Sequence, residues 1–195
     1  AGCGEDENYN SCTGVDTRPR VNEITQINSY FSPAESTSST ALLDLSNTHL
    51  PSDVHLGLQA AYITVYAKRP LRFSLFNRAM ACLPAIPMIS NHIASMRVYI
   101  YQTSNSEVTD GVEITEQLQV ISSHKKGVAE GLELTSWNES AIESPQVYFV
   151  SPDEVTTLAF IEPENILPGR YQFDIEVTLD DGELFTTRTD EITFE

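Results

Sequence analysis

The sequence predicts an all-β protein, an antiparallel sandwich with long loops and a short helical insertion. Apolar residues recur mostly with a period of two, as in half-buried strands. Turn-forming residues separate the apolar segments, and Gly127 and Gly131 interrupt the one segment that could form a long helix, 125–137. Hydrophobic residues make up 41% of the 195 residues, which is enough for a substantial core.

The first half of the chain contains five predicted strands. Turn formers at 32–40 and a proline-broken segment at 79–89 separate them, and the last strand is rich in β-branched and aromatic residues. The predicted strands span residues 21–30, 41–46, 54–67, 71–76 and 93–102.

The middle of the chain leaves two domain organisations open. Residues 108–123 indicate a turn followed by a short helical turn or a strand, and 125–137 is ambiguous. One organisation is a polar tether over 1–20 followed by one elaborated sandwich over 21–195. The alternative is two small sandwiches divided near 103–144.

The C-terminal third gives the clearest pattern. Short strands are expected at 147–150 and 157–161, and the segment 172–179 alternates strictly between apolar and polar residues. Such alternation is typical of a half-buried antiparallel strand. The apolar face consists of Tyr171, Phe173, Ile175, Val177 and Leu179, and the polar face of Gln172, Asp174, Glu176 and Thr178.

A hairpin closes the chain. Asp181 and Gly182 suit the two central positions of a type I′ turn, which need positive φ. Residues 184–194 then return as the partner strand. The parity of the apolar positions changes between Phe185 and Ile192, which predicts a β-bulge.

This hairpin, preceded by Leu167-Pro168-Gly169-Arg170-Tyr171, resembles the last two strands of immunoglobulin-like and fibronectin-like domains. The resemblance implies that Tyr171 is the corner tyrosine, whose hydroxyl bonds back to nearby backbone. The chain departs from the immunoglobulin pattern because it has no inter-sheet cysteine pair, and Trp137 is not on a predicted core strand. The resemblance concerns the fold and carries no function.

The chain begins with Ala1-Gly2-Cys3, which resembles the end of a bacterial lipobox. The resemblance implies a lipid anchor on Cys3 and therefore the membrane as a partner. The acidic run at 4–7 resembles the export signal of Bacteroidota lipoproteins, which implies display on the outer face of the outer membrane. Attachment on the periplasmic side is the alternative, and so is an unmodified cysteine that follows two residues left from cloning.

The other two cysteines, Cys12 and Cys82, are an even pair. An exported protein passes through an oxidising compartment, so we expect them to form a disulfide. Two free thiols are the alternative, with Cys82 buried as a small apolar side chain.

The excess of acidic residues argues against nucleic acid as a partner. The chain has 28 acidic and 11 basic residues, a formal net charge of −17, so its surface repels nucleic-acid phosphates. No apolar run approaches the roughly 18 residues that a membrane span needs.

No catalytic residue, cofactor or metal is predicted, and we expect a non-enzymatic protein. There is no Gly-x-Ser-x-Gly elbow and no phosphate-binding loop. None of the histidines stands at metal-ligand spacing from another. Oxygen-rich segments at 6–10 and 180–183 are alternative Ca²⁺ sites, although a tether and a turn already explain them. The histidines are His49, His55, His92 and His124.

A row of side chains on the strand 93–102 is the candidate binding surface. Met96, Val98 and Ile100 form the apolar alternate of this strand, so Arg97, Tyr99 and Tyr101 point to the other face. Tyrosine and arginine in such a row could stack on sugar rings or form a protein hot spot. Alternatively, a second layer of the sandwich or the segment 125–144 covers this face.

The layout of the chain resembles that of uncharacterised β-sandwich lipoproteins of gut Bacteroidota. The expected function is therefore binding, of polysaccharide or of protein, or assembly at the cell surface. A structural pilus or surface-assembly subunit is one alternative. An exported hydrolase or its accessory module is another.

Overall fold

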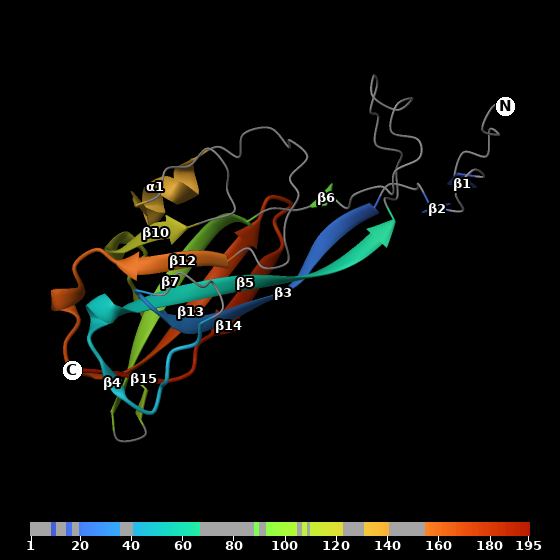
Figure 1. Cartoon of the computed structure of the whole chain (residues 1–195). Helices are drawn as coiled ribbons and strands as arrows, with labels where there is room; N and C mark the ends of the chain where they lie inside the picture. The colour runs from blue at the N-terminus through green and yellow to red at the C-terminus, as the bar shows by residue number, and fades with distance from the viewer. Residues whose placement is uncertain are drawn as a thin grey trace.

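Two β-sheets pack face to face in this protein. The computed structural model describes residues 9–10, 15–16, 20–35, 41–66, 88–89, 93–104, 107–108, 110–122, 131–140 and 155–195. Within them, strands dominate and the one α-helix is short, α1 at Leu134–Glu139 (Figure 1). The predicted all-β sandwich is confirmed.

The first sheet is built around the long antiparallel pair β3 (Arg20–Pro33) and β5 (Val54–Tyr66). Their register shifts by one residue between Ile24 and Gln26, which marks a bulge at Thr25. The full strand order is β11 (Leu132–Glu133), β10 (Leu118–Ser122), β12 (Val155–Phe160), β5, β3 and β6 (Met88–Ile89).

The second sheet is built around β13 (Gly169–Leu179). β7 (Ile93–Ser104) pairs with one side of β13, and β14 (Leu184–Arg188) and β15 (Ile192–Phe194) pair with the other. β4 (Thr48–His49) extends the sheet beside β15, and β8 (Glu107–Val108) and β9 (Val112–Glu113) lie beside β7. Separately, β1 (Tyr9–Asn10) pairs with β2 (Val15–Asp16) within the predicted tether.

The chain crosses between the sheets repeatedly. If β3, β5, β7, β10, β12, β13 and the β14–β15 return strand are numbered one to seven, the first sheet has the order 4-5-2-1 and the second the order 7-6-3. Strands two and three, three and four, and five and six therefore lie in different sheets. Residues on both sides of the ambiguous 103–144 stretch belong to one hydrophobic core, which lies between the two larger sheets.

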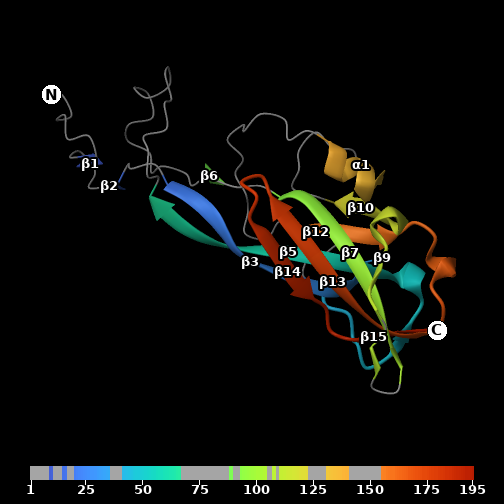
Figure 2. The same ribbon diagram turned by 180° about the vertical axis from the view of Figure 1, so that it is seen from behind.

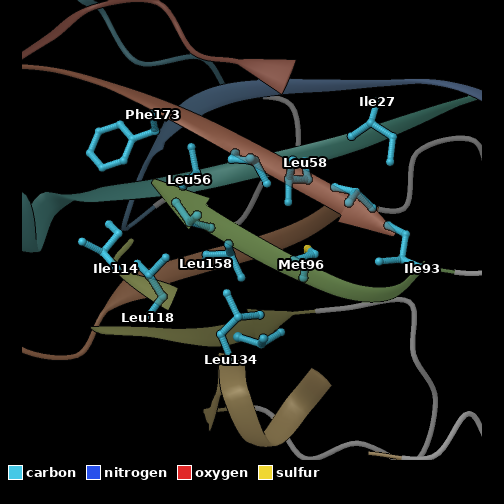
Figure 3. Close-up of a cluster of buried hydrophobic side chains, with 14 of the residues drawn as sticks. Ile27, Leu56, Leu58, Ile93, Met96, Ile114, Leu118, Leu134, Leu158 and Phe173 are labelled. Carbon is cyan, nitrogen blue, oxygen red and sulfur yellow. The ribbon is translucent and has the colours of Figure 1, made fainter. Parts of the chain in front are cut away.

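Aromatic side chains join the two sheets in the core. The ring of Phe173 on β13 lies 5.7 Å from that of Phe31 on β3 and 6.0 Å from that of Phe160 on β12, centroid to centroid. Phe160 also meets Phe194 of β15 edge to face, at 6.1 Å. Aliphatic side chains from both sheets fill the rest of this layer, among them Leu56, Leu58, Met96, Leu118 and Leu158 (Figure 3).

The ambiguous middle of the chain closes one side of the sandwich. A 3₁₀ turn, η2 (Thr115–Gln117), leads into β10, so the segment contains both of the predicted alternatives. Helix α1 has six residues and buries Leu134 and Trp137 completely in the core. Trp137 is thus a core residue, although it lies on a helix and not on a strand.

Two predictions from the sequence are wrong in detail, and the first concerns the strand at 41–46. Oδ1 of Asp44 accepts hydrogen bonds from the backbone N–H and the hydroxyl of Ser46, at 3.1 and 2.7 Å. This local turn competes with strand pairing. Within 41–46, Leu43 alone forms a backbone hydrogen bond to a strand, from its N–H to Phe31 O of β3 at 2.9 Å. The next strand along the chain is β4, at Thr48–His49.

The second correction concerns the hairpin turn. Gly182 N donates to Leu179 O and Leu179 N donates to Glu183 O, so the loop consists of Asp180, Asp181 and Gly182. This is a three-residue loop and not a type I′ turn centred on Asp181 and Gly182. Gly182 does have the expected positive φ, 88°, as the last residue of such a loop requires.

The predicted bulge in the return strand is confirmed. Asp174 lies opposite Arg188, whereas Tyr171 lies opposite Ile192, so the return strand contains one extra residue between the two pairs. The strands predicted at 71–76 and 147–150 lie outside the described residues, as do Cys3, Cys12 and Cys82.

Tyr171 forms the bond that the resemblance to immunoglobulin-like domains implies. Its hydroxyl donates to the carbonyl oxygen of Leu167 at 2.8 Å. The ring is buried against Phe194, and burial raises the pKa of the phenol. The bond fixes the corner through which the chain enters β13.

We predict that Tyr171→Phe lowers the free energy of unfolding by about 1 kcal/mol, because the variant loses one hydrogen bond and keeps the buried ring. Urea denaturation measures this difference. Tyr99→Phe is the control: the hydroxyl of Tyr99 lies 3.4 Å from its acceptor on Glu176, so we expect a change under about 0.5 kcal/mol. Equal effects of the two variants would contradict the assignment of Tyr171 as the corner residue.

Candidate functional site

The candidate site lies on the outer face of the second sheet, which we define as the outward side chains of β7, β13 and β14. Arg97, Tyr99 and Tyr101 point to this face, as predicted: Arg97 is exposed and both tyrosines are half-buried. Met96 and Val98 point inward and are fully buried, whereas Ile100 is partly buried against the core.

The described part of the predicted covering segment, 131–140, does not lie over this row. Leu134 and Trp137 point into the core. Asn138 bonds to the edge of β7, accepting from Met96 N–H and donating to Met96 C=O, each at 2.8 Å. Figure 2 shows β7, β13 and β14 side by side on this face, with α1 beyond the β7 margin.

Strand pairing places charged side chains next to the tyrosines. Asp174 of β13 lies between Tyr99 of β7 and Arg188 of β14. In the next pair along, Glu176 lies opposite Arg97. The outer face therefore carries acidic residues on its central strand, between basic residues on the two strands beside it.

Arg188 is held on this face by Asp174. Its Nε and Nη2 donate to the two carboxylate oxygens of Asp174, at 2.5 and 2.6 Å. Bidentate pairs of this kind are short and geometrically specific. The guanidinium lowers the pKa of Asp174, chiefly through these hydrogen bonds. The Arg188 guanidinium also lies 5.0 Å from the centre of the Tyr101 ring, within cation–π range.

A glycine makes room for Tyr101. A Cβ atom at Gly111 would lie 2.5 Å from Cζ of the Tyr101 ring and 2.7 Å from its hydroxyl, so the ring occupies the space that any larger residue would fill. Desolvation raises the pKa of the Tyr101 phenol, and its hydrogen bond with Asp174 adds to the shift. Tyr101, Asp174 and Arg188 thus form one interlocked unit, which we call the Tyr101 cluster.

Reasoning from the sequence missed the partnership of Asp174 with Arg188. The alternation at 172–179 placed Asp174 on a polar face. A two-residue turn at Asp181 and Gly182 would have put Thr189 opposite Asp174, whereas the three-residue loop puts Arg188 there. A one-residue change of register exchanges the two faces of a strand, so the pair could be found only with the correct loop.

The other candidate groups that lie within the described residues do not assemble into a site. Among the described residues, no group of three or more His, Cys, Asp or Glu side chains could hold a metal ion. His49 is hydrogen bonded to Asp44 O at 2.9 Å, and burial lowers the pKa of His55. His92 and His124 lie outside the described residues. No helix in the described ranges has the length and apolar character of a membrane span.

Comparison with protein-family models, with curated proteins and with solved structures gave no match to this chain. The Tyr101 cluster and its surroundings are therefore the basis for a functional proposal.

We predict that the contribution of Asp174 to the stability of the fold is lost in acid. A carboxylate with a lowered pKa in the folded state contributes stability that is present above its unfolded pKa, about 4, and is lost as the pH falls through its folded value. Wild type should therefore be more stable than Asp174→Asn at pH 7, and this difference should shrink towards about pH 2.

Urea unfolding at the two pH values measures the difference in stability. Asp190→Asn is the control because Asp190 is exposed, and its difference from wild type should change less. If the gap between wild type and Asp174→Asn is the same at both pH values, the ion pair with Arg188 does not stabilise the fold.

Proposed function

We propose that this protein is a non-enzymatic, lipid-anchored cell-surface protein that binds polysaccharide through the outer face of its second sheet. The observation that carries the proposal is the Tyr101 cluster, a fixed aromatic ring beside a bidentate ion pair. Tyr99 and the exposed Arg97 extend this surface along β7.

The geometry of the cluster favours binding over catalysis. Asp174 has a lowered pKa and both of its oxygens accept from Arg188, whereas a general acid must hold a proton near neutral pH. A side chain that is already held in place loses little conformational entropy when a ligand binds. The cluster therefore has the properties of a preorganised contact surface.

The chemistry of the face suits a sugar chain. A tyrosine ring offers an apolar face on which a pyranose can stack, and its hydroxyl offers a polar group at the rim. Gln172 lies opposite Tyr101 and Glu176 opposite Arg97 in the strand pairing, so amide and carboxylate groups stand beside the aromatic row. Such groups can bond to sugar hydroxyls.

The fold class within the sandwiches is also part of this proposal. The strand orders 4-5-2-1 and 7-6-3 correspond to the ABED and CFG sheets of constant-type immunoglobulin domains. The bond between Tyr171 and Leu167 supports the same assignment. We infer an immunoglobulin-like sandwich displayed from the outer membrane, with the periplasmic face as the alternative location.

Binding can be tested with a thermal-shift screen of the chain against polysaccharides and mucin glycans. A ligand at a hundred times its dissociation constant adds about 2.7 kcal/mol of stability. Tyr101→Ala should weaken binding of any glycan found by about tenfold or more, because it removes the stacking ring. Ile63→Ala is the control: Ile63 is an exposed apolar side chain on the first sheet.

A glycan that binds Tyr101→Ala as tightly as wild type would place the site elsewhere. If a folded protein shifts with none of the glycans, the polysaccharide proposal is wrong, and a protein partner becomes the candidate for this face.

The lipid anchor is tested separately. Cys3 carries the thiol that diacylglycerol would modify, so Cys3→Ser should move the protein from the membrane fraction of cells to the soluble fraction. Cys82→Ser is the control, because loss of the predicted disulfide with Cys12 should not release the protein. A Cys3→Ser protein that stays membrane-bound and carries no lipid label would exclude this anchor.

A further inference from the structure

Among the described residues of the second sheet, β7 and β15 have partners on both sides, whereas β14 pairs with β13 alone. At the β7 margin, Asn138 bonds to the backbone of Met96, and Thr115 Oγ1 and Ile114 N–H bond to the backbone of Val98. Beyond these, β9 pairs with Tyr99 and Ile100 of β7, and β8 pairs with Thr103 and Ser104. At the opposite margin β4 covers β15, and within the described residues no strand pairs with the outer edge of β14. Figure 2 shows β14 at this margin.

The backbone groups at this edge can be assigned from the hairpin. Glu183 C=O and Thr189 N–H both bond to β13, to Leu179 and Phe173 respectively. Since the direction of backbone groups alternates along an antiparallel strand, the intervening odd-numbered residues also face β13. Leu184, Thr186 and Arg188 therefore direct their N–H and C=O groups away from the sheet.

The edge lacks the usual protection against strand addition. Natural proteins guard such edges with lysine, proline or inward-pointing charges, and β14 has the sequence Leu-Phe-Thr-Thr-Arg. Its one charge is already bound to Asp174. Leu184 is 59% exposed, and Thr186 is exposed as well. An extended chain could therefore approach this strand.

The edge is also held in place from the inner side. The Thr187 and Ser29 hydroxyls are hydrogen bonded at 3.0 Å, which joins β14 to β3 of the other sheet. Arg188 ties the end of β14 to Asp174 of β13. A strand that is fixed before binding needs little further ordering when a partner pairs with it.

Acidic residues flank β14 at both ends. Asp180, Asp181 and Glu183 precede it, and Asp190 and Glu191 follow it. Some of these carboxylates have local partners: Asp181 Oδ1 accepts from the Glu183 N–H at 3.0 Å, and Glu191 lies 3.7 Å from Arg170. Antiparallel pairing of two copies centred on Thr186 would place Asp181 opposite Glu191 of the second copy. Like charges opposite each other destabilise pairing, so this arrangement disfavours a second copy as the occupant.

We propose that β14 accepts an extended polypeptide segment of another protein as an additional strand, and that this segment has a β-branched centre and basic residues at both ends. The main chain of β14 supplies the hydrogen bonds, and the flanking carboxylates select the basic ends. This site lies at the edge of the sheet and does not depend on the polysaccharide proposal for the outer face.

The first test uses a synthetic peptide, Lys-Lys-Thr-Val-Thr-Val-Thr-Lys-Lys, labelled for fluorescence anisotropy with the full chain. We expect saturable binding, at least about tenfold tighter than that of the same peptide with glutamate in place of each lysine. A third peptide, N-methylated at two consecutive central residues, lacks a donor on each of its edges. We expect it to bind about tenfold more weakly than the parent.

The second test changes the edge itself. Thr186→Pro removes an N–H that points away from β13, and proline is tolerated at such edge positions. It should weaken the lysine peptide by about tenfold or more and leave the circular dichroism spectrum unchanged. Thr186→Val keeps the N–H and should bind within about threefold of wild type.

Three results would overturn the proposal. They are no binding of the lysine peptide up to about 1 mM, equal binding of the N-methylated peptide, and a folded Thr186→Pro protein that binds like wild type. A second copy of this chain is the other possible occupant of the edge, and sedimentation tests for it. A dimer of the full chain that Thr186→Pro abolishes would make the second copy the partner and would contradict the proposal of a different protein. If Thr186→Pro does not fold, the N-methylated peptide with wild-type protein decides the question.

Discussion

The burial of alternate residues along β13 is the constraint on which the rest of this structure depends. Tyr171, Phe173, Ile175, Val177 and Leu179 are each at most 6% exposed, and Phe173 contacts aromatic rings of the opposite sheet. A shift of β13 by one residue would move this entire set to solvent and carry charged side chains into the core. The hydrophobic effect therefore fixes the register of β13, and β13 in turn fixes that of β7 and of the hairpin.

The outer face follows from the same constraint. Once the apolar residues of β13 point inward, Gln172, Asp174, Glu176 and Thr178 must point outward, and pairing brings Tyr99 and Arg188 to either side of Asp174. The Tyr101 cluster is thus positioned by regular strands and not by a loop, which gives a binding surface its precision. The same strand order leaves β14 at the margin, where its outward backbone groups have no partner strand among the described residues.

Much of the fold could be predicted from the sequence because strict alternation is a strong signal. The strands β3, β5, β7, β12 and β13, the bulge in the return strand and the orientation of Arg97, Tyr99 and Tyr101 all follow from a period of two. Two predictions failed because short-range hydrogen bonding and turn geometry are not encoded in a period of two. Asp44 forms a side-chain turn with Ser46 where a strand was expected, and Asp181-Gly182 fits two hairpin loops of different length. The hydrogen bonds from Asn138 to the edge of β7 could not be predicted, because they join residues that are distant in the chain and no local pattern indicates them.

The central claim, that β13 sets the register of the sheet and leaves one edge of β14 open, is tested most directly by residue-specific amide hydrogen exchange. We predict the slowest exchange at the amides of β13, which has partner strands on both sides. Within β14 we predict slow exchange at Phe185 and Thr187 and fast exchange at Thr186. Such an alternation within β14 would establish both its pairing with β13 and its open edge. Fast exchange along β13 would contradict its role in setting the register, and equal protection of Thr186 and Thr187 would contradict the open edge of β14.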